Sequence, residues 1–274
     1  MSSATTTPDF EAIKTTQRAG WETGDYTRVG NTLQIIAERL VEAADVRAGR
    51  RALDVACGQG NAALAAARRF AEAVGVDYAR NLLAVGRERA AVENLPVTFL
   101  EGDAEQLPVP DDTCDYTLST VGVMFAPNHQ RAADELVRVT APGGRIGLAS
   151  WTPSGMIGQL FGAIGTWAPP PAGVRPPALW GSPEHLTELF GDRVEWVSLR
   201  TRVFTFHYHS AEHFSEWFRR YYGPVTRLAG TLSGEDLQRF GEDLAGVAAQ
   251  FNRADDGTLA AGAEYLEAVG VVRA

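Results

Sequence analysis

The chain has 274 residues, 45% of them hydrophobic and 22% charged, and a formal net charge of −9 at pH 7. This composition excludes a wholly disordered or fibrous protein, and the acidic balance argues against partners such as nucleic acid or an anionic membrane. Two cysteines, Cys57 and Cys114, cannot build a disulfide framework or a four-cysteine zinc site, so we expect reduced thiols in a cytoplasmic protein without a signal peptide or membrane span.

The first half of the chain is predicted to alternate between strands and helices. An N-terminal cap segment (1–30) precedes an amphipathic helix over 31–45, where apolar residues recur at helical spacing. Strands are then predicted at 51–56, 73–77, 97–101, 114–120 and 145–151, with helices at 61–72, 81–93 and 129–140 between them. Such alternation implies right-handed crossovers and a mostly parallel sheet, here a core over 31–151.

The second half, residues 152–274, is predicted to complete the same domain. A weak helix over 156–167 and a proline-rich loop over 168–177 fall in a lid segment, 152–181. Ser182 and Pro183 are typical of a helix start. Alternating residues predict a strand over 194–208, followed by a helical insertion (211–251) and a last strand within 263–272.

The stretch from Leu53 to Asn61, LDVACGQGN, carries the strongest functional signal. Gly58 and Gly60 stand where a strand turns into a helix, so a ligand can lie against backbone N–H groups at the helix N-terminus. Two glycines in this position also occur in plain tight turns. With the alanines that follow, they further fit a loose dinucleotide fingerprint, which would indicate an NAD(P)-dependent oxidoreductase.

Acidic residues follow the next two predicted strands. Asp77 lies 23 residues after Asp54 and could accept hydrogen bonds from two ribose hydroxyls. Asp103 and Ala104 follow the third strand and could pair with an adenine through a carboxylate and a backbone N–H. Acids at strand ends are often only solvated or cap a helix. Together with the glycine turn, however, they would line one crevice of an open α/β sheet, which favours a nucleoside pocket.

These motifs resemble class I S-adenosylmethionine-dependent methyltransferases, in the branch that includes ubiquinone/menaquinone-type C-methyltransferases and small-molecule tailoring enzymes. The resemblance implies a Rossmann-like, doubly wound α/β fold with a seven-stranded, mostly parallel sheet, an antiparallel last strand and helical lid insertions. It implies S-adenosylmethionine as the cofactor. The residues expected to bind it are Asp54, Ala56, Gly58, Gln59, Gly60, Asp77, Tyr78, Asp103, Ala104 and Thr120.

The predicted activity is methyl transfer to oxygen or carbon of a small organic acceptor, with catalysis mainly by positioning. His129 is the first candidate for a catalytic base, although it could equally be a solvated or capping residue. Tyr26 is a second catalytic candidate, because in the family this region often closes over the cofactor. Too few ligands accompany the histidines for a metal site, so none is predicted.

The acceptor is predicted to be apolar or aromatic, because tryptophan and tyrosine are abundant beyond the fifth strand. The aromatic C-terminal helices could instead bury against a second copy in a homodimer. A methyltransferase-fold protein with a non-methylating role is the third alternative, because no residue is a decisive catalytic group.

Overall fold

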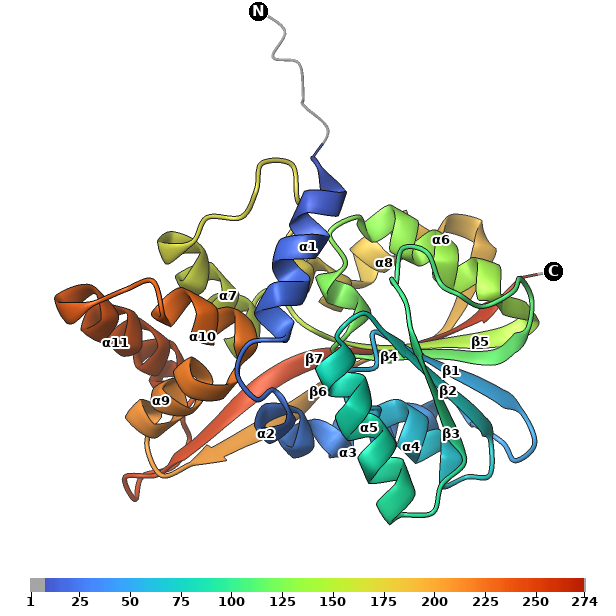
Figure 1. Ribbon diagram of the computed structural model, residues 1–274, viewed down its shortest axis with the longest axis horizontal. Coiled ribbons are helices and arrows are strands. Elements are labelled where there is room, and N and C mark those ends of the chain that lie inside the picture. Colours follow the sequence, from blue (N-terminus) through green and yellow to red (C-terminus); the bar gives the residue numbers. More distant parts are fainter. Residues whose placement is uncertain (1–7, 274) are drawn as a thin grey trace, which may run out of the picture.

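A seven-stranded sheet forms the centre of the computed structural model, which describes residues 8–273, in the order β3-β2-β1-β4-β5-β7-β6 (Figure 1). Strands β1 to β5 pair in parallel, whereas β7 is antiparallel to both of its neighbours, β5 and β6. The predicted seven-stranded sheet with an antiparallel last strand is therefore confirmed. The strands are β1 (Arg51–Val55), β2 (Glu72–Asp77), β3 (Val97–Glu101), β4 (Cys114–Thr120), β5 (Thr140–Trp151), β6 (Val194–Tyr208) and β7 (Leu259–Val272).

Helices cover both faces of this sheet, which explains why its central strands consist of continuous apolar runs. One face carries α3 (Gln34–Ala43), α4 (Asn61–Ala67) and α5 (Arg80–Val92). The other carries α6 (His129–Val139) and α8 (Pro183–Phe190) (Figure 1). Short 3₁₀ turns are η1 (Asn31–Leu33), η2 (Val123–Phe125), η3 (Pro177–Gly181) and η4 (Gly191–Arg193). Within the described residues, no helix combines the length and apolar character needed to cross a bilayer.

A second group of helices packs beside the sheet, at the end of the long β6–β7 ribbon (Figure 1). It contains α7 (Met156–Trp167) and the insertion between β6 and β7, which is formed by α9 (Ala211–Tyr221), α10 (Gly223–Ala229) and α11 (Gly234–Gln250). Strand β7 begins at Leu259, earlier than the predicted 263, because Tyr208 of β6 already pairs with Leu259. The alanine- and glycine-rich start of β7 has low strand propensity, so the sequence pattern missed it.

The N-terminal segment contains two helices that the sequence analysis did not predict, α1 (Phe10–Trp21) and α2 (Thr27–Gly30). The Asp9 side chain caps α1 by accepting a hydrogen bond from the Ala12 backbone N–H at 3.1 Å. In Figure 1, α1 lies between α10 and α6, near the middle of the sheet. This position brings α1 to the site described below.

Candidate functional site

A cavity of about 880 Å³ lies at the carboxyl ends of β1, β2 and β4. The loop after β3, residues of α1, Tyr26 just before α2 and Leu33 of η1 complete its lining. Nine of the ten predicted cofactor-binding residues line this cavity, namely Asp54, Ala56, Gly58, Gln59, Asp77, Tyr78, Asp103, Ala104 and Thr120. The structure thus brings together residues that are up to 66 positions apart in the sequence.

Gly60 is the predicted residue that does not line the cavity. Its φ of +80° lies in the left-handed region, and a Cβ atom there would come within 2.6 Å of the Phe99 ring. The Phe99 ring also fills the space beside Gly75 and Gly86. Gly60 therefore serves the packing of α4 against β3 and α5.

Asp54 holds the turn after β1 in place. One oxygen of its buried carboxylate accepts hydrogen bonds from the backbone N–H groups of Ala62, at 3.1 Å, and Ala63, at 2.9 Å. Burial raises the pKa of this carboxyl to about 7, although both N–H groups oppose the shift. Asp54 is thus mainly a cap for the first turn of α4.

Asp77 connects the end of β2 to the same turn. Its Oδ2 accepts a hydrogen bond from the Gly58 backbone N–H at 2.8 Å, and its Oδ1 accepts one from Ala79 at 2.7 Å. Burial raises the pKa of this carboxyl, whereas those N–H groups lower it. A carboxylate has about four lone-pair positions, so Asp77 retains capacity to bind ligand hydroxyls.

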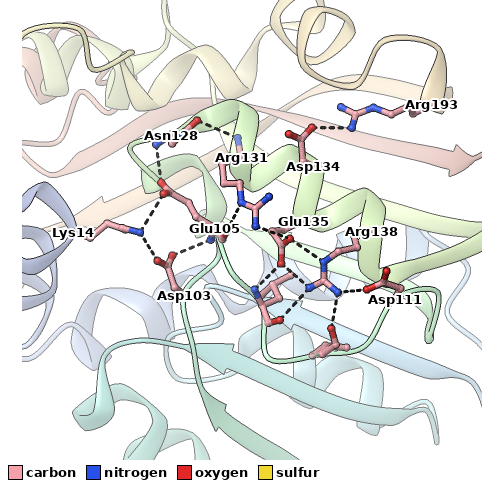
Figure 2. A network of polar contacts seen from close by, with 12 residues as sticks. Lys14, Asp103, Glu105, Asp111, Asn128, Arg131, Asp134, Glu135, Arg138 and Arg193 are labelled. Atoms are coloured by element: carbon pink, nitrogen blue, oxygen red, sulfur yellow. Dashed lines mark hydrogen bonds and ion pairs between the residues drawn. The ribbon is translucent and has the colours of Figure 1, made fainter. Parts of the chain in front are cut away.

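The far wall of the cavity is built from α1 and the loop after β3 (Figure 2). Lys14 reaches from α1 and places its Nζ 2.6 Å from Asp103 Oδ2 and 3.3 Å from Glu105 Oε2. Glu105 also accepts a hydrogen bond from the Asn128 backbone N–H at 2.7 Å, at the start of α6. Lys14 therefore offsets the negative charge of two neighbouring carboxylates and fixes α1 over the cavity.

Two polar atoms beside the cavity are buried without a hydrogen-bond partner in residues 8–273, Thr120 Oγ1 and Gln59 Oε1. Both residues line the cavity. Because an unpaired buried polar atom is costly, these atoms mark positions where a polar ligand would be stabilised.

A second, smaller cavity of about 360 Å³ adjoins the first. The two share four lining residues, Tyr26, Leu33, Val121 and Phe125. The smaller cavity is otherwise lined by apolar and aromatic side chains from α2, β5, α7, β6, α9 and the residue after it: Val29, Trp151, Ile157, Leu160, Phe161, Phe206, Phe218 and Tyr222. The sequence analysis predicted an apolar or aromatic acceptor from the abundance of tryptophan and tyrosine beyond the fifth strand but could not place these side chains around one space.

Tyr26 stands at the junction of the two cavities. Its ring packs edge-on against Trp21 at 5.3 Å between centroids. Burial raises the pKa of the Tyr26 hydroxyl, and the nearby Asp77 carboxylate adds to this shift. The side chain is therefore protonated at neutral pH and can act as a hydrogen-bond donor, which does not suit the role of a base.

His129 lies outside both cavities. Its Nδ1 is 2.9 Å from Nε2 of His185 in α8, and its ring contacts Trp180 edge-on at 5.6 Å. Burial is the main reason why the pKa of His129 falls to about 3. The structure does not bring this imidazole to the rim where the sequence analysis expected it, so its catalytic role stays a prediction that the geometry does not favour.

The chain is similar to a family model, to several known sequences and to solved structures. Residues 53–148, from β1 into β5, match a family model described as "Methyltransferase domain". The uncharacterized protein Rv1405c of Mycobacterium tuberculosis is 38% identical over 218 residues, which cover 78% of this chain and 80% of that protein. Demethylmenaquinone methyltransferase of Thermus thermophilus is 40% identical over 127 residues, 45% of this chain and 58% of that enzyme.

Among solved structures, the BH2331 protein of Bacillus halodurans C-125 has a similar fold. Its TM-score is 0.63 at 20% sequence identity, and the match covers 87% of this chain and 99% of that chain. The likeness of fold therefore extends beyond the region matched by the family model.

Proposed function

The chain belongs to the class I S-adenosylmethionine-dependent methyltransferases, and from this membership we propose that it methylates an oxygen or carbon atom of a small apolar or aromatic acceptor. The observation that carries the proposal is the pair of adjoining cavities. The larger one carries three carboxylates, Asp54, Asp77 and Asp103, at the strand ends. The smaller one has no charged lining residue and shares Tyr26, Leu33, Val121 and Phe125 with the larger.

The larger cavity has the groups that S-adenosylmethionine requires. Asp77 would accept hydrogen bonds from the ribose hydroxyls, and the loop at Asp103 and Ala104 would lie along the adenine. The unpaired oxygens of Thr120 and Gln59 would receive hydrogen bonds from the amino acid end of the cofactor. When bound, the cofactor supplies a methyl group on a positively charged sulfonium.

The chain's own contribution to the reaction is alignment and exclusion of water. Leu33, Val121 and Phe125 line both cavities, so the acceptor would meet the cofactor among apolar side chains that exclude water. Holding the two reactants in line removes a large part of the activation free energy of a bimolecular transfer. Helix α1, fixed by Lys14 on Asp103, covers the cofactor side.

Calorimetric titration with S-adenosylmethionine, S-adenosylhomocysteine and NADH tests the cofactor assignment. We expect saturable binding of the first two and none of NADH. Binding of NADH alone would overturn the proposal in favour of an oxidoreductase.

Incubation with methyl-labelled cofactor and a panel of uncharged phenols, quinols and enols tests the acceptor assignment. We expect the label in at least one product of the panel. Tight cofactor binding with transfer to none of these compounds would favour the alternative of a methyltransferase fold with a non-methylating role.

A further inference from the structure

The smaller cavity contains few polar groups, and each can donate a hydrogen bond. Among the described residues that line it, the polar side-chain atoms are the hydroxyls of Tyr26 and Tyr222 and the indole N–H of Trp151. None of the lining residues carries a formal charge at neutral pH. An acceptor that enters would therefore find an apolar surface with a small donor region.

Tyr26 and Tyr222 are close together although they are 196 positions apart in the sequence. Their ring centroids are 6.1 Å apart, and both rings pack edge-on against Trp21, at 5.3 Å and 5.5 Å. Phe218 supports Tyr222 from the preceding turn at 5.4 Å. The two phenols are thus held by surrounding aromatic rings, which fixes their relative position.

Neither hydroxyl is engaged by another described residue, and burial raises the pKa of both phenols. Protonated phenols in an apolar setting are strong donors that lack a partner within the chain. A ligand oxygen within reach of these hydroxyls would therefore gain hydrogen bonds that no described residue supplies.

We propose that Tyr26 and Tyr222 form an oxygen-binding pair, which donates hydrogen bonds to one oxygen atom of the acceptor and positions that acceptor at the mouth of the cofactor cavity. The inference rests on the proposed function, since it assigns the chemistry of the acceptor for that same site. It restricts the acceptor to uncharged hydroxyaryl, enol or carbonyl compounds, because a carboxylate, phosphate or ammonium group would enter this cavity without a countercharge.

The test compares a probe that carries the oxygen with one that lacks it. Calorimetric titrations of 2-naphthol and naphthalene are made on the protein saturated with S-adenosylhomocysteine. We expect the wild-type chain to bind 2-naphthol about tenfold more tightly than naphthalene. In Tyr222→Phe this preference should fall to about twofold or less, in line with the loss of one hydrogen bond, while naphthalene affinity is unchanged.

Tyr221→Phe is the matched control, because Tyr221 faces the guanidinium groups of Arg28 and Arg220 at 5.1 and 5.2 Å and lines neither cavity. This variant should keep the full preference for 2-naphthol. Tyr26→Phe should reduce the preference as Tyr222→Phe does, which keeps the test valid if one variant fails to fold.

The inference is overturned if Tyr222→Phe keeps the preference, if both probes weaken equally, or if the wild-type chain does not distinguish them. Each sample is also titrated with S-adenosylhomocysteine itself. Absent cofactor binding would count against the proposed function, whereas normal cofactor binding with no preference for 2-naphthol would count only against the tyrosine pair.

Discussion

Two buried carboxylates act on the same turn of the chain, but they distribute their hydrogen bonds differently. Asp54 directs one oxygen to two N–H groups at the start of α4, whereas Asp77 uses one oxygen for Gly58 and the other for Ala79. Both line the cavity, yet Asp77 lies at the strand end where the proposed function places the ribose of the cofactor. We therefore expect cofactor affinity to depend most directly on Asp77.

Replacing Asp77 by alanine should weaken S-adenosylhomocysteine binding at least tenfold, because hydrogen bonds to a charged acceptor are lost. The freed N–H groups of Gly58 and Ala79 should cost about 1–3 kcal/mol of stability. Calorimetry and urea unfolding measure the two effects. Asp115→Ala, at the start of β4, is the control and should leave affinity unchanged. An Asp77→Ala protein that is folded and binds within twofold of wild type would refute the assignment.

His129 should make the folded state sensitive to acid. Its pKa is about 3 in the folded chain against an ordinary value near 6.5, so the unfolded chain binds a proton first as the pH falls. The stability that His129 contributes is present above about pH 6.5 and is lost as the pH falls toward 3.

Substitution His129→Gln should therefore reduce the loss of unfolding free energy between pH 7 and pH 5, by on the order of 1 kcal/mol. Urea unfolding at the two pH values measures it. The exposed His207 offers a control, since His207→Gln should leave the loss as in wild type. An equal loss in all three proteins would contradict the expectation.

At the scale of elements, α1 is held over the larger cavity by ion pairs to residues that are distant in the sequence. Lys14 contacts Asp103 and Glu105, and Arg18 places its guanidinium 2.9 Å from Glu101. The Lys14 and Glu105 side chains are 12% and 5% exposed, so this pair is less screened than a surface pair. Helix α1 is thus attached to the end of β3 by charge.

Lys14→Met should consequently weaken S-adenosylhomocysteine binding several-fold and leave a folded protein, because Asp103 and Glu105 then face each other without a cation. Titration calorimetry checks this. Glu11 also contacts Lys14 but is 85% exposed, and Glu11→Gln should alter affinity by less than twofold. Comparable losses of affinity in Lys14→Met and Glu11→Gln would argue against a specific role for the contacts of Lys14 with Asp103 and Glu105.

At the scale of the whole molecule, one sheet joins the part of the chain that lines the larger cavity to the part that completes the smaller one. Strand β7 lies between β5 and β6, and it pairs with β6 over residues 259–272 and with β5 over residues 265–271. The smaller cavity takes side chains from β5 as well as from β6 and α9. The smaller cavity could not form if these two parts of the chain separated, so the chain should behave as one cooperative unit.

Calorimetric melting should accordingly show a single transition. Saturating S-adenosylhomocysteine, at 100 times its dissociation constant, should stabilise the whole chain by about 2.7 kcal/mol. That corresponds to a rise in Tm of roughly 5–10 °C for a chain of this size. Two transitions, of which the ligand moves only one, would show that the halves unfold independently.

Much of the fold could be predicted because its signals are local. The apolar runs that became β1, β3 and β4 have short periods, and their bounds agree with the prediction within a residue. The helix after β1 begins at the predicted Asn61 but ends at Ala67, five residues before the predicted end. The glycine turn and the acids at Asp77 and Asp103 follow strand ends, and parallel strands place their carboxyl ends at one edge of the sheet. Nine of ten predicted residues consequently line one cavity.

The sequence by itself therefore determined the family, the sheet and the cofactor side of the site, because these depend on spacing within about 30 residues. Only the tertiary structure decided which residues lie across from these strand ends. Lys14 meets Asp103 across 89 positions, Tyr26 meets Tyr222 across 196, and His129 turns away from the cavity to His185. These partners meet because whole helices pack against the sheet. A local pattern of residues does not predict which helix will face which strand end.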